Sequence, residues 1–307
     1  MVQTLVFIKR YFALIIKKLF FILLLYTLVG AKPLAASSKH DITILVSSCD
    51  KYSHLWDIFF KLLFQSWPSL RAENSDIPII LVSNTKKYND SRITHALSDA
   101  KLKWTGNIAH ALSQVKTKYV LYLQDDYFIA RPVIESVIWN TLSEMDKYSL
   151  EHVGLYQHYF ETHKHELAKV GPSRSLRYKN HDMPYLASLH TSIWKTTTIK
   201  ELVNSKESSI WDFDNVRLKP WQKFAFYTPN PKPILYVNFM SIGNVRFTPY
   251  SWAYYKGYDL SFAENYRLSG KRGQYLQRLK ELSPTLAKVV LFISGMCVDI
   301  SITLKSL

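Results

Sequence analysis

Residues 119 to 129 read Tyr-Val-Leu-Tyr-Leu-Gln-Asp-Asp-Tyr-Phe-Ile, so an apolar run is interrupted by two adjacent carboxylates, Asp125 and Asp126. A short apolar run of this kind predicts a buried strand. Ligands of open α/β sheets bind outside the carboxyl ends of the strands. Neighbouring carboxylates repel each other when desolvated, so this position indicates a compensating cation, and all-oxygen ligation favours Mg²⁺ or Mn²⁺. The alternative is a solvated turn in which an Asp caps the next element.

The segments before this run predict strands and helices in alternation. Two β-rich apolar runs, Ile42–Ser47 and Ile77–Val82, read as buried strands. Helical spacing of apolar residues extends over Leu55–Trp67 and Asn107–Val115. Alternating strands and helices imply parallel, right-handed βαβ units, so we expect an α/β fold with a mostly parallel sheet and flanking helices.

Polar side chains follow the first two predicted strands. Ser47, Ser48 and Asp50 come at and after the end of the first strand, and Asn84 follows the second. Parallel strands end at the same edge of a sheet, so these residues are candidates for contact with a nucleotide base or ribose. The alternative is that they cap the next helix.

Beyond the central run, the sequence predicts a helix over Val133–Tyr148 and a strand over Ile234–Met240. The polar, basic stretch His163–Pro184 reads as a mobile loop. The apolar stretch Leu286–Ile300 is about 14 residues long, which is short for a membrane span, so we favour a packing helix or an interfacial helix there.

The N-terminus carries a membrane signal. Thirteen apolar residues, Leu19–Ala31, are preceded by four cations at positions 9, 10, 17 and 18. A cleaved secretory signal, an uncleaved anchor and an interfacial helix on an anionic leaflet are all compatible with it, and we favour the latter two. We therefore divide the chain into a membrane or signal segment (1–36), an α/β domain (41–245) and a basic, aromatic C-terminal extension with an apolar terminal helix (246–307).

The composition restricts the partners. A formal charge of +15 and a pI near 9.5 call for an anionic lipid, a nucleic acid or a phosphate-bearing substrate. The chain has no helix-turn-helix, RNP or zinc-finger pattern, so we expect no nucleic acid. Its two cysteines imply no disulfide framework.

Taken together, the motifs resemble the nucleotide-sugar glycosyltransferases of the GT-A fold, in particular bacterial family-two-like enzymes of surface polysaccharide synthesis. The resemblance covers about residues 41–245. It rests on four matches in order: Ile44–Tyr52; Pro78–Asn84; Trp104 and Asn107 with the run Tyr119–Phe128; and Leu189–Trp194 followed by Trp211–Asp214. It implies a Rossmann-like GT-A domain, in which Asp125 and Asp126, within the run Tyr119–Phe128, take the place of the family's Asp-x-Asp motif.

The resemblance also implies roles for single residues. Asp126, helped by Asp125, would hold Mn²⁺ or Mg²⁺, and Asp214, with Asp212 as second candidate, would be the catalytic base. Nucleotide contacts would come from Ser47, Ser48, Asp50, Asn84, Gln124 and Asp125. The chain departs from the family where Gln124 replaces the first Asp of Asp-x-Asp, and where Asp214 replaces a longer Glu. Gln124 can still accept a ribose hydrogen bond but brings no charge.

The function expected from this resemblance is sugar transfer (hexosyltransferase type) from a nucleotide-sugar donor to a glycan or lipid-linked acceptor in surface polysaccharide or lipopolysaccharide biosynthesis. The expected location is an anionic membrane surface at the cytoplasmic face of the inner membrane. A single-pass signal anchor with the domain on the far side is the alternative. Two other functions stay open, a non-catalytic membrane-associated protein of the same fold and a basic nucleic-acid-binding protein.

Overall fold

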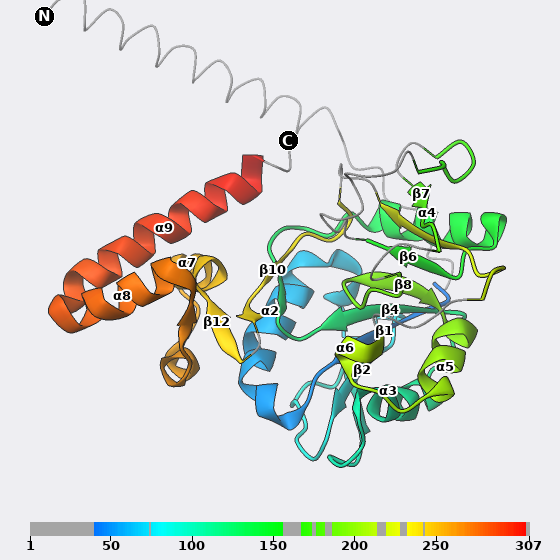
Figure 1. The fold of residues 1–307 in the computed structure, drawn as a ribbon, viewed down its shortest axis with the longest axis horizontal. Coiled ribbons are helices and arrows are strands. Elements are labelled where there is room, and N and C mark those ends of the chain that lie inside the picture. Colours follow the sequence, from blue (N-terminus) through cyan, green and yellow to red (C-terminus); the bar gives the residue numbers. More distant parts are fainter. Residues whose placement is uncertain are drawn as a thin grey trace, which may run out of the picture. The chain divides into compact units, whose positions relative to one another are not determined.

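The computed structural model describes residues 40–73, 75–155, 167–173, 176–181, 186–213, 219–227, 232–241 and 243–304. Within it, His40–Leu307 form one compact unit (Figure 1). The predicted N-terminal membrane segment and the candidate base Asp214 lie outside the described residues. Both therefore remain predictions.

An eight-stranded sheet forms the centre of this unit. Its spatial order is β3 (Ile93–Leu97), β2 (Ile79–Ser83), β1 (Ile42–Ser47), β4 (Tyr119–Gln124), β8 (Ser192–Lys195), β6 (His152–Gly154), β9 (Phe224–Tyr227) and β7 (Leu176–Tyr178). The first four strands are parallel to one another, and β6 and β9 run in the same direction beyond the antiparallel β8. The edge strand β7 is antiparallel. The expected α/β architecture with a mostly parallel sheet is confirmed.

Both faces of the sheet are buried, which explains why its central strands are almost wholly apolar. In β4, Tyr119, Leu121 and Leu123 join one hydrophobic core while Val120 and Tyr122 join the other. The first core is completed by helices α2 (Trp56–Ser66) and α4 (Glu135–Tyr148). The second is completed by helices α3 (Trp104–Ser113), α5 (Thr196–Ser205) and α6 (Ile210–Phe213). Short 3-10 helices lie at Asp50–Leu55 (η1) and Pro68–Leu70 (η2).

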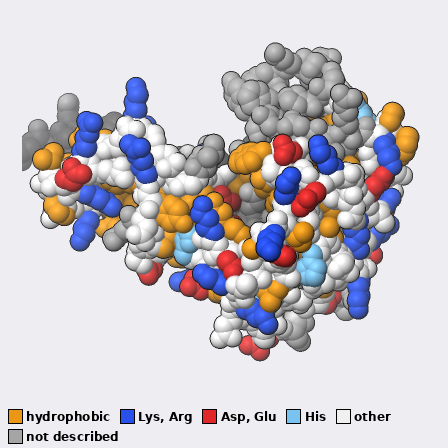
Figure 2. Space-filling view, turned by 60° about the horizontal axis from the view of Figure 1, so that its bottom comes forward, with side chains coloured by type: hydrophobic (Ala, Val, Ile, Leu, Met, Phe, Trp, Pro, Cys, Tyr) orange, Lys and Arg blue, Asp and Glu red, His pale blue; other side chains and the backbone are white. Residues whose placement is uncertain are grey.

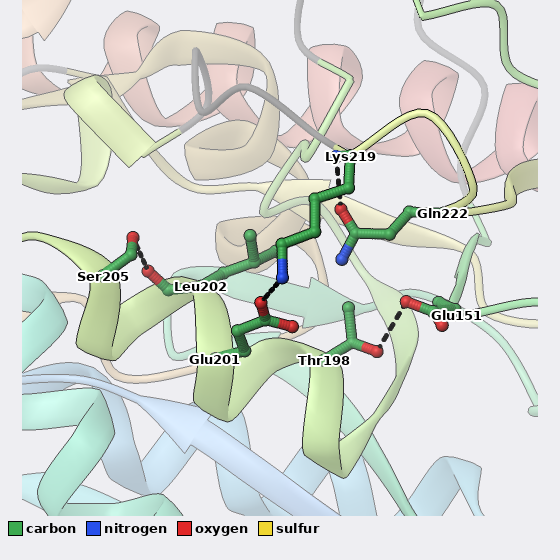
Figure 3. A network of polar contacts seen from close by, with 7 residues as sticks. All are labelled: Glu151, Thr198, Glu201, Leu202, Ser205, Lys219 and Gln222. Carbon is green, nitrogen blue, oxygen red and sulfur yellow. Dashed lines mark hydrogen bonds and ion pairs between the residues drawn. The ribbon is translucent and has the colours of Figure 1, made fainter.

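Polar contacts attach α5 to the strand layer (Figure 3). Thr198, in the first turn of α5, donates a hydrogen bond of 2.9 Å from Oγ1 to Glu151 Oε2. Glu151 directly precedes β6. Glu201 forms an ion pair with Lys219, whose backbone N–H donates to Gln222 Oε1 at 2.8 Å. The helix is thereby connected to segments on both sides of it in sequence.

The C-terminal part of the chain contributes to two small sheets and contains the helices that follow them. The sheets consist of β5 (Tyr127–Ile129) paired with β10 (Tyr236–Asn238), and of β11 (Met240–Ser241), β12 (Asn244–Arg246) and β13 (Leu268–Ser269). The helices that follow are α7 (Phe247–Tyr255), η4 (Ser261–Asn265), α8 (Gly270–Leu282) and α9 (Pro284–Leu304). Phe262 of η4 packs on His54 with ring centroids 4.8 Å apart. The predicted domain boundary at residue 245 falls within β12.

The structure corrects three predictions about elements. Part of the predicted mobile loop His163–Pro184 is the edge strand β7, and the prediction was wrong there. Strands β3 and β9 were not predicted, because four or five residues hold too little periodicity to separate strand from loop. Helix α9 has 21 residues, so the argument from a length of about 14 against a membrane span does not hold.

Candidate functional site

The site lies where the strand order changes direction. From β1 the chain proceeds outward through β2 and β3, and it then returns to β4 on the other side of β1. Ligands of open α/β sheets bind in the crevice beside such a switch point, at the carboxyl ends of the strands. Here β1 and β4 end in register, because Ser47 pairs with Gln124. Ser48 and the carboxylates that follow Gln124 therefore share one edge of the sheet.

Asp125 is a buried carboxyl group at this edge, with 5% of its surface exposed. Ser48 Oγ donates a hydrogen bond to Asp125 Oδ2, and Trp56 Nε1 donates to Ser48 Oγ over 2.8 Å. Burial, and next the charge of Asp126, raise the pKa of Asp125 well above its ordinary value. A compensating cation would be needed to hold both carboxylates ionised at neutral pH.

Asp126 is the more accessible of the two, with a partly exposed side chain. Its backbone carbonyl accepts a hydrogen bond of 2.8 Å from Phe239 N, so the turn between β4 and β5 is held against the β10–β11 connection. Burial raises the pKa of Asp126 to about 7, against the opposing effects of backbone hydrogen bonds, including one from Met240, and of the Arg246 charge. Asp126 is therefore an acidic group that is poorly compensated by the protein itself.

A divalent metal fits this pair only if the substrate supplies further ligands. Among the described residues no group of three His, Cys, Asp or Glu side chains could hold a metal. Mg²⁺ is commonly bound through one or two carboxylates together with waters and substrate phosphates. Asp126 suits that role better than Asp125, one of whose oxygens already binds Ser48.

Ser47 and Gln124 each connect the site to a neighbouring element. Trp104 Nε1 of α3 donates to Ser47 Oγ at 3.2 Å. Gln124 Nε2 donates to the carbonyl of Leu189 at 3.0 Å, before β8 begins. Their predicted nucleotide contacts are untested, and the structure assigns each a positioning contact at the end of its strand.

Asp50 and Asn84 form a clip between the loops after β1 and β2. The Asp50 carboxylate accepts hydrogen bonds from the backbone N–H groups of Asn84, Thr85 and Lys86 and from the Thr85 hydroxyl. Burial acts to raise the pKa of Asp50, but these bonds outweigh it and lower the pKa to about 2. Asn84 Oδ1 faces Asp50 N at 3.4 Å. A nucleotide contact by either residue stays a prediction.

The predicted acceptor-side residues differ in position. Asp212 is exposed on α6, where it accepts a 2.7 Å hydrogen bond from Ser209 Oγ that lowers its pKa. Phe213 is buried against Trp104 at a centroid distance of 4.9 Å, so α6 lies beside the Ser47 end of the site. Trp194 and Phe213 are buried core residues, so neither can present an aromatic surface to an acceptor. Trp211, in contrast, is 67% exposed.

A cluster of Tyr127, Tyr236 and His190 was missed by the sequence analysis. The two tyrosine rings stack at 4.2 Å, and both hydroxyls lie within hydrogen-bond distance of His190 Nδ1, at 3.1 and 2.9 Å. Tyr127 directly follows Asp126, and His190 directly follows the carbonyl bound by Gln124. The signal was present in the sequence for Tyr127, but only the β5–β10 pairing brings Tyr236 to it.

A cationic cavity of about 530 Å³ is lined in part by Arg246, whose charge also acts on Asp126. The parallel pairing of β12 with β13 places Arg246 opposite Ser269, at the start of α8. Lys271 and Arg272 extend the lining. Gly270 has a φ of 78°, a left-handed conformation suited to glycine at this sharp entry into the helix. No sequence pattern indicated the cavity, because its cations come from separate segments.

Comparison with known proteins yields remote likenesses only. No protein-family model and no curated protein matches the chain. Solved structures that resemble it include S. aureus TarS 1–349 (TM-score 0.39, 11% identity, 84% of this chain and 80% of that one). Another is the mannosyltransferase PcManGT from Pyrobaculum calidifontis in complex with GDP-Man and Mn²⁺ (TM-score 0.36, 10% identity, 87% and 77%). In a further TarS crystal structure the likeness spans 62% of this chain and 37% of that one, with a TM-score of 0.36 and 11% identity.

Proposed function

We propose that this chain is a metal-assisted glycosyltransferase of the GT-A kind, which moves a sugar from a nucleotide-sugar donor to an acceptor. The observation that carries the proposal is the position of Asp125 and Asp126. They lie at the carboxyl end of β4, beside the end of β1, with pKa values raised by burial. A nucleotide site of an open α/β sheet is expected at this switch point, and an uncompensated acidic pair there suits a cation carried in with a diphosphate.

The residues then divide the chemistry between them. A bound Mn²⁺ or Mg²⁺ would stabilise the negative charge that develops on the leaving diphosphate. Asp126 would hold the ion, while Asp125, anchored by Ser48, would fix the turn that presents Asp126. Gln124 donates a hydrogen bond to the carbonyl of Leu189. This bond keeps the segment before β8, which includes His190, beside the turn.

Loss of the acceptor hydroxyl proton needs a base on the acceptor side. Asp214 remains our candidate, supported by the burial of its neighbour Phe213 against Trp104 beside the Ser47 end of the site. Asp212 is the weaker candidate because its carboxylate already binds Ser209.

The acceptor in this proposal is a phosphate-bearing, lipid-linked glycan. The cationic cavity supports it, because Arg246, Lys271 and Arg272 would each favour an anionic group there. A place in surface polysaccharide or lipopolysaccharide synthesis, at the cytoplasmic face of the inner membrane, belongs to the same proposal.

Donor and metal binding can be tested by thermal shift. We expect one of the UDP-, GDP-, CMP- or dTDP-sugars to raise the melting temperature of the chain only when Mn²⁺ is present. Asp126→Asn should abolish that Mn²⁺-dependent rise and reduce transfer at least 100-fold, on the order of 3 kcal/mol of transition-state stabilisation. The exposed Asp76→Asn serves as the matched control.

The two possible failures of this test have different meanings. A metal-dependent rise that survives in Asp126→Asn would refute the metal assignment. A folded protein that binds none of the four donors would favour the non-catalytic alternative.

The cavity is tested separately by titrating the chain with inorganic pyrophosphate in a metal-free buffer. We expect the double variant Lys271→Ala, Arg272→Ala to bind at least tenfold more weakly, because two cations of the lining are lost. Arg71→Ala, which removes an exposed cation elsewhere, should bind normally. Equal affinity in the double variant would exclude the cavity as a diphosphate site.

A further inference from the structure

Helix α9 exposes a continuous apolar face. Five large side chains are each about half exposed, at 47 to 51%: Leu286, Val289, Phe292, Ile293 and Ile300. With 3.6 residues per turn, they fall on one side of the helix. Within the described chain, Pro284–Thr303 is the one helix long and apolar enough, by length and composition, to cross a membrane, with a mean hydropathy of 1.8. Only 17% of the most apolar 18-residue stretch of this helix is buried, so the apolar face of the helix is largely without a protein partner in the described chain.

The opposite face of α9 is packed against protein. Ala287 and Leu291 are buried, and Gly295 lies so close to α7 that an added Cβ would be 2.0 Å from the Ser251 carbonyl oxygen. Near its end, Asp299 forms an ion pair of 2.8 Å with Lys256, just after α7. A transmembrane orientation would pull these polar groups into the bilayer, whereas an in-plane orientation leaves them on the protein side.

The neighbouring helix α8 supplies positive charge. Helix α8, Gly270–Leu282, carries four cations and a single acid, Glu281. The cations are Lys271, Arg272, Arg278 and Lys280. Tyr275 and Leu282 of the same helix are 63% and 83% exposed. At the end of Figure 2 that corresponds to α8 and α9 in Figure 1, blue Lys and Arg side chains stand among orange hydrophobic ones. Exposed apolar groups bordered by cations are typical of helices that lie on anionic bilayers.

We propose that the α8–α9 surface, meaning the exposed faces of Gly270–Leu282 and Pro284–Leu304, docks in the plane of a bilayer that contains anionic phospholipid. Charge complementarity selects this occupant, because Lys and Arg side chains near a surface of anionic phospholipid are attracted to it. The apolar side chains of α9 would enter the boundary between headgroups and acyl chains, to a depth of about 5–10 Å. This inference does not depend on sugar transfer.

The docked orientation has a consequence for the cationic cavity. Lys271, Arg272 and Phe247 line that cavity and also a second one of about 300 Å³, whose other walls include Tyr275 and Val290. Both cavities are therefore lined by the start of α8, and the second is also lined by α9. If the proposed function also holds, a headgroup-borne acceptor would reach the cations without leaving the membrane.

The test uses the full chain with a nitroxide label on the natural Cys297, which is exposed on α9, in a Cys49→Ser background. Label depth is measured by power saturation with oxygen and a nickel chelate. Vesicles contain either phosphatidylcholine alone or phosphatidylcholine with roughly a third phosphatidylglycerol. We expect Cys297 to be immersed on the anionic vesicles only, and Lys101→Cys, on the exposed surface before α3, to stay in water in both.

Labels at positions 289, 293, 297 and 300 distinguish in-plane docking from a span. Docking predicts similar depths at all four, whereas a span predicts a gradient of about 1.5 Å per residue. The double variant Arg278→Glu, Lys280→Glu should bind the anionic vesicles at least tenfold more weakly. Less of the label at Cys297 should then be immersed. A steep gradient, immersion that ignores lipid charge, or a water-exposed label on anionic vesicles would each overturn the proposal. So would lipid-independent burial of the label against a second copy or against Leu19–Ala31.

Discussion

At the level of single residues, Ser48 has the clearest structural role in the site. Its hydroxyl accepts from Trp56 Nε1 and donates to Asp125, so one small side chain satisfies two buried polar groups. A buried polar group left without its partner costs more than an average hydrogen bond contributes. Ser48 therefore decides whether the turn carrying Asp126 keeps its shape.

Ser48→Ala should accordingly lower the free energy of unfolding by about 1–3 kcal/mol, since both partners lose their bond. Denaturant unfolding measures this loss. Trp56→Phe, combined with Ser48→Ala, should cost less than the sum of the single variants, because the second change removes a group that the first left unsatisfied. Ser91→Ala, at an exposed serine, is the control. Strict additivity of the two changes would contradict the shared network.

His152 makes the fold sensitive to acid. Its ring is fully buried between Trp194 and Phe224, with centroid distances of 4.2 and 4.8 Å. Burial, and then the charge of Lys179, hold the pKa of His152 well below its ordinary value of 6.5. The folded chain therefore keeps the ring neutral where the unfolded chain binds a proton, and stability due to His152 is lost as the pH falls below about 6.5.

His152→Phe should remove this dependence while retaining an aromatic ring. Relative to the wild type, the variant should gain stability by about 1.4 kcal/mol for each pH unit below 6.5. Chemical denaturation at pH 8.5, 7.5, 6.5 and 5.5 measures this difference in stability, which should be constant between pH 7.5 and 8.5. His110→Gln, at an exposed histidine, should leave the pH profile unchanged. A constant offset for His152→Phe down to pH 5.5 would disprove the buried neutral state.

At the level of elements, the packing of α9 on α7 depends on a glycine. A Cβ at Gly295 would lie 2.0 Å from Ser251 O and 2.5 Å from Tyr255 Cβ, distances that real atoms do not adopt. The backbone of α7 cannot give way as a flexible side chain would. The close approach of the two helices therefore requires glycine at this position.

Gly295→Ala should separate the helices and destabilise the chain by about 1–3 kcal/mol, despite the better helix propensity of alanine. Relative to the wild type, hydrogen exchange in the variant should accelerate more in the α9 amides than in the amides of β1 or β4. Ser294→Ala, one residue away and half-exposed, should be neutral or slightly stabilising. A gain of stability in Gly295→Ala would show that the helices do not approach so closely.

At the level of the whole molecule, the residues after 245 are integrated with the sheet domain. Leu260, Ala263 and Leu276 belong to the same hydrophobic core as Ile44 and Leu121. Phe239 also packs against Phe262, with centroids 5.9 Å apart. The extension predicted from composition thus covers part of the domain core.

A chain that ends after residue 245 should therefore not fold to the native state. The exposed core residues are expected to bring dye binding, fast proteolysis and loss of a cooperative melting transition. The matched control ends after residue 304 and should retain that transition. A cooperative, protease-resistant fragment of residues 1–245 would establish an independent domain and contradict this expectation.

Local sequence determined much of this protein. Buried strands β1, β2 and β4 were recognisable because each needs apolar residues on both faces, and the carboxylates at the end of β4 interrupt such a run. Helices α2, α3 and α4 followed from the local sequence, with apolar residues at helical spacing in α2 and α3. These signals are local, since they depend on residues a few positions apart.

The tertiary structure alone decided which side chains meet. Tyr236 reaches Tyr127 through the β5–β10 pairing, and Arg246 reaches Ser269 through the β12–β13 pairing. Neither pairing has a sequence period, because the strands contribute only two or three residues each. Asp50 illustrates the same limit: its position after a strand made it a candidate for a ligand contact, and only the structure shows that its carboxylate accepts hydrogen bonds from the backbone of the next loop. Sequence specifies which groups stand at a strand end, but long-range pairing determines their partners.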